Sequence, residues 1–207
     1  MIAASLSLYL VADPDHCKGN LISTVEKAIS GGVTCVQLRA KTLPDREQVQ
    51  LAIALRDVCR RGNVPFIVND RLDIALAAGA NGIHLGVDDL PTVLARSIAP
   101  DGFIIGYSPE TDAQILTAGE HGVDYLGVGP VFGTRTKGDA GDALEIEEFG
   151  RRCAISSVPV VGIGGINAAN CSKVINAGAA GIAVVSAILA SPDTAAAARD
   201  LRRQSGT

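Results

Sequence analysis

Short apolar runs alternate with longer amphipathic segments along the whole chain. One pattern recurs four times, consisting of a glycine, a short turn and a mostly apolar run, at residues 32–38, 79–85, 122–128 and 178–184. Each copy predicts a helix that ends on a left-handed glycine and is followed by a buried strand. Further apolar runs between the copies predict strands at residues 8–11, 65–68, 103–106 and 159–163.

This alternation predicts a parallel barrel. Four repeats that each carry two strand-helix units provide the eight strands of a closed barrel, whereas a dinucleotide-binding sheet usually has about six. We therefore expect an α/β protein with the (β/α)8 TIM-barrel fold, formed as a single domain by residues 1–207. The apolar stretch at residues 2–12 is interpreted as the first strand, because no basic residue precedes it and no cleavage pattern follows it.

Helix signals fill the gaps between the predicted strands. Residues 21–29 carry an apolar stripe with helical spacing. Asp45 and Gln48 have the spacing of a capping box at the start of a second helix. A cap and a proline at residues 191–193 precede a last helix over residues 194–203.

Composition and charge exclude several kinds of partner. Hydrophobic residues make up 47% of the chain and aromatic residues 3%, which suits aliphatic packing between helices and a parallel sheet. The net charge of −4 provides no overall attraction to nucleic acid or to an anionic membrane. No apolar run reaches the roughly 18 residues of a transmembrane helix. Five scattered cysteines without a CxxC pair indicate reduced thiols and a cytoplasmic protein.

Polar residues gather where the predicted strands end, which is the face that carries the active site in parallel barrels. After the second strand, Gln37, Arg39 and Lys41 offer an amide and two cations, which indicate either an anion clamp or an ordinary solvated loop. Asp70 follows the third strand and Asp89 the fourth. Each carboxylate alone is more typical of a helix cap, but two on adjacent loops favour a Mg2+ site that also binds phosphate oxygens.

The second half of the chain offers groups for another phosphate. Thr134, Thr136 and Lys137 follow the sixth strand and indicate an anion site or a basic surface loop. The segments 162–167 and 184–187 place backbone N–H groups near helix starts after the seventh and eighth strands, where such barrels often bind phosphate. None of the three histidines is assigned a role, and motifs of serine hydrolases and zinc proteases are absent.

Together these motifs resemble the thiamine phosphate synthase family. The resemblance covers residues 9–190 and rests on eight short motifs in order, at 37–41, 69–71, 84–86, 89–91, 127–132, 134–137, 164–166 and 184–187. The chain departs from the family pattern at Val87, where glutamine is common. It also departs behind Ser108, where the family has a hydroxyl and a histidine and this chain has Pro109, Glu110 and Thr111.

The resemblance implies a Mg2+-dependent transferase of thiamine biosynthesis. It would condense 4-amino-2-methyl-5-hydroxymethylpyrimidine diphosphate with 4-methyl-5-(2-hydroxyethyl)thiazole phosphate, or its carboxylate form, to give thiamine phosphate and diphosphate. The residues implied for the pyrimidine diphosphate are Gln37, Arg39, Lys41, Asn69, Ser108 and Lys137, of which Arg39, Lys41, Ser108 and Lys137 would act in catalysis. Asp70 and Asp89 would bind Mg2+, and the thiazole phosphate would contact Thr134, Thr136, Gly165, Val185 and Ser186.

The mechanism implied by the resemblance is dissociative. The electron-rich aminopyrimidine expels diphosphate and leaves a stabilised cation, which the thiazole nitrogen captures. Since that nitrogen is already a nucleophile, the reaction needs no general base, and positive charge around the diphosphate is the main requirement.

Two alternative functions use the same barrel. A thiazole tautomerase shares the thiazole phosphate site but generally lacks an intact pyrimidine diphosphate site, and a non-catalytic regulator would bind thiazole or thiamine phosphate through the same loops. The intact set favours the synthase over both, and its members are Arg39, Lys41, Asn69, Asp70, Asp89 and Lys137. The expected partners are small phosphorylated substrates, and a homo-oligomer is a further expectation because barrel exteriors often pair.

Overall fold

The computed structural model describes residues 2–133 and 142–206. Parallel strands form a closed barrel in the order β1 to β8, and β1 pairs with both β2 and β8. The strands are β1 (Leu8–Ala12), β2 (Cys35–Leu38), β3 (Phe66–Asn69), β4 (Gly82–Leu85), β5 (Ile104–Tyr107), β6 (Tyr125–Val128), β7 (Val160–Ile163) and β8 (Gly181–Val184). The sequence-based prediction of a (β/α)8 barrel is confirmed.

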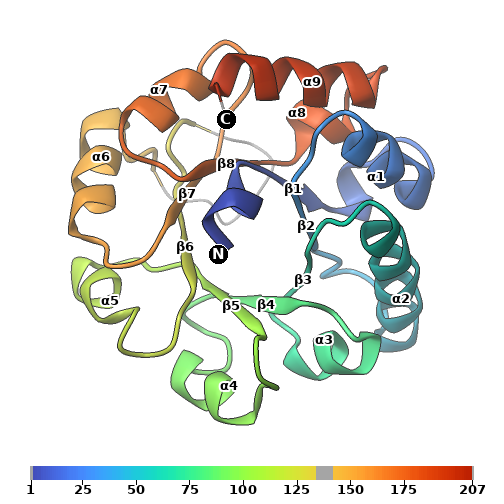
Figure 1. The fold of residues 1–207 in the computed structure, drawn as a ribbon, viewed down its shortest axis with the longest axis horizontal. Coiled ribbons are helices and arrows are strands. Elements are labelled where there is room, and N and C mark those ends of the chain that lie inside the picture. The colour runs from blue at the N-terminus through green and yellow to red at the C-terminus, as the bar shows by residue number, and fades with distance from the viewer. Residues whose placement is uncertain (1, 134–141, 207) are drawn as a thin grey trace.

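Helices surround the barrel in a ring (Figure 1). The α-helices are α1 (Leu21–Ser30), α2 (Asp45–Arg61), α3 (Leu72–Ala78), α4 (Thr92–Ile98), α5 (Asp112–Thr117), α6 (Ile146–Ile155), α7 (Cys171–Asn176), α8 (Ser186–Leu189) and α9 (Thr194–Ser205). Two 3-10 helices precede α1, namely η1 (Ile2–Leu6) and η2 (Pro14–His16). No helix in the described part of the chain is long and apolar enough to span a membrane.

Strand side chains alternate between two hydrophobic clusters, as the pleat of a β-strand requires. Leu8 and Leu10 of β1 face the helices and belong to the larger cluster, which fills the space between the barrel and its helical ring. The smaller cluster fills the barrel interior and consists of Leu6, Tyr9, Val11, Cys35, Ile67, Tyr125, Val161 and Ala183. The position of a polar residue along its strand therefore decides whether its side chain points into the barrel or toward the helices.

The four leading glycines of the repeat have the predicted backbone conformation. Gly32, Gly79, Gly122 and Gly178 have φ values of 108°, 66°, 74° and 104°. This region is open to glycine and unfavourable for most other residues, so each glycine reverses the chain from a helix into the next strand.

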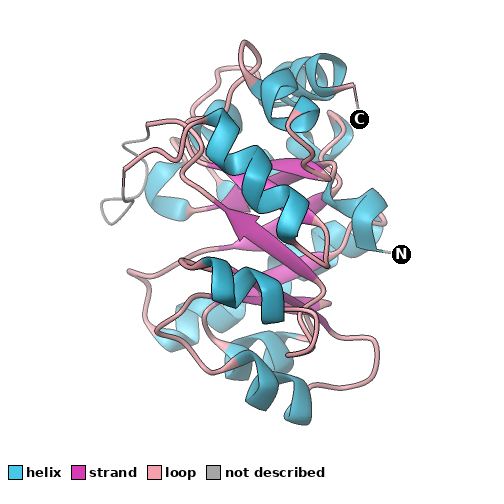
Figure 2. Ribbon diagram, turned by 90° about the vertical axis from the view of Figure 1, so that its left-hand side faces the viewer, coloured by secondary structure: helices cyan, strands magenta, loops and turns pink. Residues whose placement is uncertain are grey.

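The N-terminal segment corrects one prediction. Residues 2–6 were expected to extend the first strand, but they form η1, and only residues 8–12 pair in the sheet. Figures 1 and 2 show this short helix at one end of the barrel, across its opening. Leu6 is fully buried there against the interior cluster. An apolar run that must close the open end of a barrel cannot also continue its wall.

The start of α2 corrects a second prediction. Asp45 is the first helical residue, the N-cap position is occupied by Pro44, and no side chain caps it, so the expected capping box is wrong. The Gln48 side chain instead donates hydrogen bonds to the backbone carbonyls of Ala40 and Leu43. It thereby holds the loop after β2, which carries predicted site residues.

The last helix starts as predicted. The side chain of Asp193 accepts a hydrogen bond of 2.9 Å from the N–H of Ala196 and so caps α9. The helix continues two residues beyond the predicted end, to Ser205, and stops at Gly206, whose φ is 69°.

Candidate active site

A cavity of about 1000 Å³ opens at the carboxyl ends of the strands. Every predicted site residue that the structure describes lines it, namely Gln37, Arg39, Lys41, Asn69, Asp70, Asp89, Ser108, Gly165, Val185 and Ser186. Three others, Thr134, Thr136 and Lys137, lie outside the described residues. These residues meet in one cavity because each of them either points into the barrel at the end of its strand or lies in the loop that follows the strand.

The cationic part of the cavity wall is built after β2. Gln37 and Arg39 both face the cavity, as the alternation along this strand predicts, and Lys41 lies in the loop beyond. Nη1 of Arg39 donates a hydrogen bond of 2.8 Å to Oδ2 of Asp13, whose side chain is only 4% exposed. Sequence reasoning missed Asp13, although an acidic residue directly after a buried strand is a signal of the same kind as Asp70. This buried ion pair fixes the direction of the Arg39 side chain.

Asp70 and Asp89 form a carboxylate pair opposite these cations. Oδ2 of Asp70 lies 3.1 Å from Nζ of Lys41. Burial and the neighbouring Asp89 carboxyl raise the pKa of Asp70, and Lys41 opposes that rise. Oδ2 of Asp89 accepts a hydrogen bond of 2.6 Å from the N–H of Gly86. Lys41 therefore offsets only part of the rise in the pKa of Asp70 that burial and Asp89 cause.

Neither carboxylate caps a helix, so the cap interpretation of each is wrong. The N-cap positions of α3 and α4 are Arg71 and Pro91, without side-chain caps. Asp70 has a left-handed backbone with φ of 62°, and its N–H donates a hydrogen bond of 2.9 Å to the carbonyl of His84. A strained backbone held in this way is typical of functional positions.

The carboxylate pair fits a magnesium ion. Among residues 2–133 and 142–206 there is no group of three or more His, Cys, Asp or Glu side chains arranged to hold a metal. Mg2+ differs from ions that need a full protein cage, because it commonly takes one or two carboxylates and completes its shell with water and phosphate oxygens. Asp70 and Asp89 provide that donor set beside a cavity that also contains cations for an anion.

A chain of polar side chains crosses the barrel interior and lines the cavity. Gln37 donates a hydrogen bond of 3.1 Å to the Tyr9 hydroxyl, which lies 2.7 Å from the Tyr125 hydroxyl. His84 lies between Tyr125 and Ser108, with Nδ1 3.0 Å from the phenol oxygen and Nε2 2.8 Å from Oγ. Sequence analysis assigned no role to His84 and did not single out either tyrosine. The available sequence signal was a polar residue at a strand position whose side chain points into the barrel.

The loops after β6 and β7 pack tightly against each other at the other side of the cavity. The N–H groups of Val131 and Phe132 donate to the carbonyls of Ile163 and Gly164, at 2.9 and 3.1 Å. Gly165 has φ of 63°, and a Cβ there would come within 2.6 Å of a backbone carbonyl oxygen. Helix α7 begins at Cys171, beyond the segment 162–167, whereas α8 begins at Ser186, within the segment 184–187.

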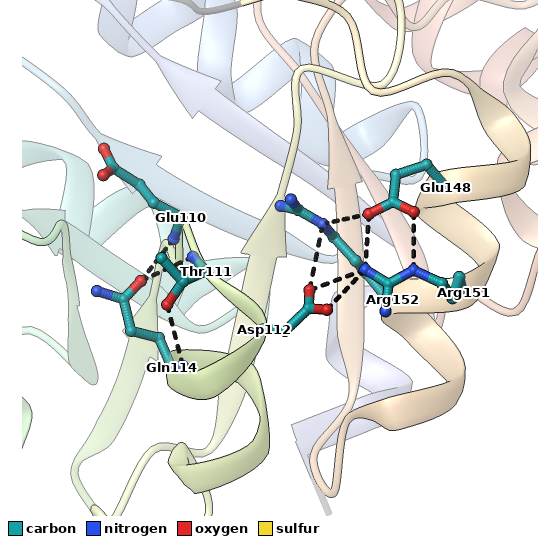
Figure 3. Close-up of polar contacts among 7 residues, drawn as sticks. All are labelled: Glu110, Thr111, Asp112, Gln114, Glu148, Arg151 and Arg152. Atoms are coloured by element: carbon teal, nitrogen blue, oxygen red, sulfur yellow. Dashed lines mark hydrogen bonds and ion pairs between the residues drawn. The ribbon is translucent and has the colours of Figure 1, made fainter.

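An ion-pair network connects α5 with α6 and reaches the cavity at Arg152 (Figure 3). Arg151 contacts Asp112 at 2.8 Å and Glu148 at 2.7 Å. Arg152 contacts Glu148 at 3.0 Å and also lines the cavity. Guanidinium hydrogen bonds from Arg151 and Arg152 lower the pKa of Glu148 to about 2. The network joins the two helices that follow β5 and β6.

Behind Ser108, where the chain departs from the family pattern, Thr111 is the N-cap residue of helix α5. The Thr111 hydroxyl accepts from the Gln114 N–H, and the Gln114 side chain accepts from the N–H of Thr111, which together form a capping box for α5 (Figure 3). The Thr111 hydroxyl therefore serves as the cap of α5. Pro109 and Glu110 line the cavity.

Comparison with known proteins gives consistent results. A sequence model of the thiamine monophosphate synthase family matches residues 8–188. Thiamine-phosphate synthase from Coprothermobacter proteolyticus is 47% identical over 198 residues, which cover 95% of this chain and 93% of the relative. The enzyme of that name from Chloroflexus aurantiacus is 46% identical over 94% of this chain and 90% of the relative.

Solved structures with a similar fold include a member of the same family. Thiamine phosphate pyrophosphorylase from Pyrococcus furiosus superposes with a TM-score of 0.91 at 36% identity, covering 100% of this chain and 98% of that chain. A 3-hexulose-6-phosphate synthase superposes with a TM-score of 0.70 at 15% identity, over 96% of this chain and 99% of that chain. The second similarity concerns the fold alone.

Proposed function

Since this chain belongs to the thiamine monophosphate synthase family, we propose that the cavity at the carboxyl ends of its strands is the active site for thiamine phosphate synthesis. The protein is a transferase that condenses hydroxymethylpyrimidine diphosphate with hydroxyethylthiazole phosphate and releases diphosphate. One observation carries the assignment of the site. Ten residues that were named from the sequence for these substrates and the metal meet in one cavity, although they come from strand ends all around the barrel.

The cavity divides into two halves. Gln37, Arg39, Lys41, Asn69 and Ser108 bind the pyrimidine diphosphate, with Arg39 and Lys41 compensating the charge of its phosphates. Gly165, Val185 and Ser186 bind the thiazole phosphate on the opposite wall. The position of Arg39 supports this division, because its ion pair with buried Asp13 leaves the guanidinium at the cavity surface in a fixed direction.

The residues Asp70 and Asp89 would hold Mg2+ in the diphosphate half. A magnesium ion bound there supplies charge neutralisation for the leaving diphosphate. Lys41, at 3.1 Å from Asp70, links this carboxylate pair to the cationic wall.

The reaction then follows from positioning and charge. Arg39 and Lys41 stabilise the departing diphosphate, and Ser108 orients the pyrimidine from the far side of the barrel. The thiazole phosphate contacts hold the second substrate with its ring nitrogen toward the carbon that loses diphosphate. Bringing two bound substrates into register in this way removes much of the entropic part of the barrier. The predicted roles of Thr134, Thr136 and Lys137 in this reaction stay predictions.

We further propose that one domain, residues 1–207, carries the whole activity in the cytoplasm. Small phosphorylated molecules are the substrates, and nucleic acid and membranes play no part. The free thiols of all five cysteines support a reducing compartment. Assembly into a homo-oligomer stays a prediction that sedimentation of the purified protein would test.

A single assay tests the proposed function. The purified protein is incubated with both substrates, with Mg2+ or with a chelator, and thiamine phosphate and diphosphate are quantified. We expect equal amounts of both products with Mg2+ and a loss of turnover with the chelator. Binding of the thiazole phosphate without diphosphate release would indicate a regulator, and isomerisation of the thiazole carboxylate without condensation would indicate a tautomerase.

A further inference from the structure

The turn after β1 contacts the cationic loop after β2 at two points. Oδ2 of Asp13 lies 2.8 Å from Nη1 of Arg39, and the Thr42 hydroxyl donates to the Asp15 carboxylate at 3.0 Å. Arg39 and Lys41 line the cavity, whereas Asp13 and Asp15 are not among its lining residues. The turn therefore braces, from outside the cavity, a segment that carries two proposed diphosphate ligands.

The carboxylate of Asp13 has a partner at each oxygen. Oδ1 accepts a hydrogen bond of 2.9 Å from the N–H of Asp15 and so caps η2, while Oδ2 binds Arg39. The side chain of Asp13 is only 4% exposed, so little water is available to replace a lost partner. A buried carboxylate without a partner is strongly unfavourable. Arg39 is therefore held at Asp13 unless another donor replaces it at Oδ2.

A second nitrogen lies beside the same oxygen. Nδ1 of His16 is 3.5 Å from Oδ2 of Asp13. This nitrogen is buried and, within the part of the chain that the structure describes, has no hydrogen-bond partner, which is unusual for a buried polar atom. The backbone N–H of His16 donates to the carbonyl of Asp13 at 3.1 Å, which keeps the two residues together. Since an N–H···O bond is about 2.9 Å long, a shift of less than about 1 Å would give Nδ1 a partner.

Two anions compete for Arg39 when its proposed ligand is present. The guanidinium pairs with Asp13 and also lines the cavity, where the pyrimidine diphosphate is proposed to bind. A diphosphate carries more negative charge than one carboxylate and draws the guanidinium toward the cavity. That movement weakens the bond between Arg39 and Asp13. His16 places its unused nitrogen within reach of the oxygen that is released.

We propose that Asp13 and His16 are positioning residues that control Arg39 through an exchange of partners. Without a ligand, Oδ2 of Asp13 binds Arg39 and Nδ1 of His16 is unbonded. With diphosphate bound, His16 donates from Nδ1 to Asp13, and Arg39 turns toward the phosphates. The carboxylate keeps a partner in both states, so no buried charge is left unpaired. This inference rests on the proposed function for the identity of the diphosphate, but the exchange can be tested without turnover.

The position of the proton on His16 measures the exchange. The imidazole is 31% exposed, so its proton can move between the two nitrogens through water. Nitrogen NMR of 15N-histidine protein at about pH 8, where an ordinary imidazole is neutral, distinguishes the two tautomers, and His16→Asn assigns the signals. We expect inorganic diphosphate with Mg2+ to raise the share of protein with the proton on Nδ1 at least about twofold.

Two variants define the partners in this response. Arg39→Met should place the proton on Nδ1 of His16 without any ligand, because Asp13 has then lost its arginine. Asp13→Asn should abolish the response to diphosphate, because an asparagine whose oxygen caps η2 presents an amide N–H to His16 in place of an acceptor.

Calorimetric binding of inorganic diphosphate with Mg2+ measures the contribution of His16. We expect His16→Phe to raise the Kd about three- to tenfold, the range of one hydrogen bond. His16→Asn, which keeps a donor near the position of Nδ1, should stay within about twofold of wild type. In Arg39→Met, the further change His16→Phe should have an effect of less than about twofold, because Asp13 then has the same partner with and without the anion. Thiazole phosphate binding should be unchanged, and His121→Phe, at an exposed histidine, is the matched control.

The outcomes separate this proposal from the proposed function. A His16 tautomer that stays unchanged with diphosphate, or in Arg39→Met, overturns the exchange of partners. Equal weakening of diphosphate and thiazole phosphate binding in His16→Phe shows a merely structural role and overturns the proposal as well. If Asp13→Asn does not fold, the comparison of His16→Phe with His16→Asn tests the same exchange. A wild-type protein that shows the exchange with diphosphate but makes no thiamine phosphate rejects the proposed function alone.

Discussion

Asp70 combines three unfavourable features at a single residue. Its carboxyl is partly buried, a second carboxylate lies beside it, and its backbone φ is 62°. Because its pKa is raised in the folded protein, the ionised form lowers stability at every pH above the ordinary range, and protonation relieves this as the pH falls. The charge of Asp70 therefore does not stabilise the fold.

Asp70→Asn should therefore separate activity from stability. We expect turnover to fall by at least about a hundredfold, because a proposed ligand of Mg2+ is lost. The melting temperature should stay equal or rise, since asparagine tolerates a left-handed backbone and carries no charge. Steady-state kinetics and thermal unfolding monitored by circular dichroism measure the two effects.

Asp101→Asn is the matched control for this change, because it removes the same charge from an exposed turn at the other end of the barrel. It should alter neither rate nor melting temperature. A near-wild-type rate for Asp70→Asn would remove Asp70 from the reaction.

At the scale of the elements, β5 and β6 depend on each other through a glycine. Gly106→Ala would press a methyl group against the ring of Tyr125. We expect a loss of about 1–3 kcal/mol in the free energy of unfolding, typical of overpacking in a core, together with lower activity. Gly19→Ala is the control, because a Cβ there meets nothing within 4 Å. Equal stability of the two variants in urea unfolding would contradict the tight packing of β5 on β6.

The pairing of α5 with α6 predicts a pH dependence. Arg151 and Arg152 lower the pKa of Glu148 to about 2. The stability that this pairing contributes is therefore complete above the usual glutamate pKa and is lost as the pH falls toward 2. A carboxyl NMR titration should find Glu148 ionised at pH 3. Arg151→Gln should move its titration upward toward the usual range, whereas the distant Arg199→Gln should leave it unchanged.

At the scale of the whole molecule, η1 closes the barrel at the end opposite the cavity. Leu6→Ala should lower the free energy of unfolding by about 2–5 kcal/mol, as expected for a fully buried leucine, and should leave kcat unchanged. Ile98→Ala, at a side chain that is 61% exposed, should cost less than about 0.5 kcal/mol. Urea unfolding measures both variants. A large fall in kcat for Leu6→Ala would show that this end of the barrel communicates with the site.

Many elements of the barrel could be predicted from local sequence signals. The remaining features depend on contacts between residues that are far apart in the sequence. Gly79 marks the end of α3, because a left-handed backbone is a property of one residue. The contact of Tyr9 with Tyr125 joins residues 116 positions apart and has no local signature. The path of residues 2–6 depends on an opening that exists only after the barrel has closed. The cap interpretations of Asp70 and Asp89 failed for the same reason, since tertiary neighbours decided their partners.

The glycines under the polar chain also have an evolutionary consequence. Gly106 and Gly127 have no chemical role of their own, yet they decide whether an imidazole and a phenol fit inside the barrel. In a lineage that abandoned the pyrimidine substrate, selection on these glycines and on Tyr125 would relax together. An alignment of the family should then show these three positions changing as a group, independently of the residues around the thiazole phosphate. Such a signature would mark relatives that share the name of the family but not its reaction.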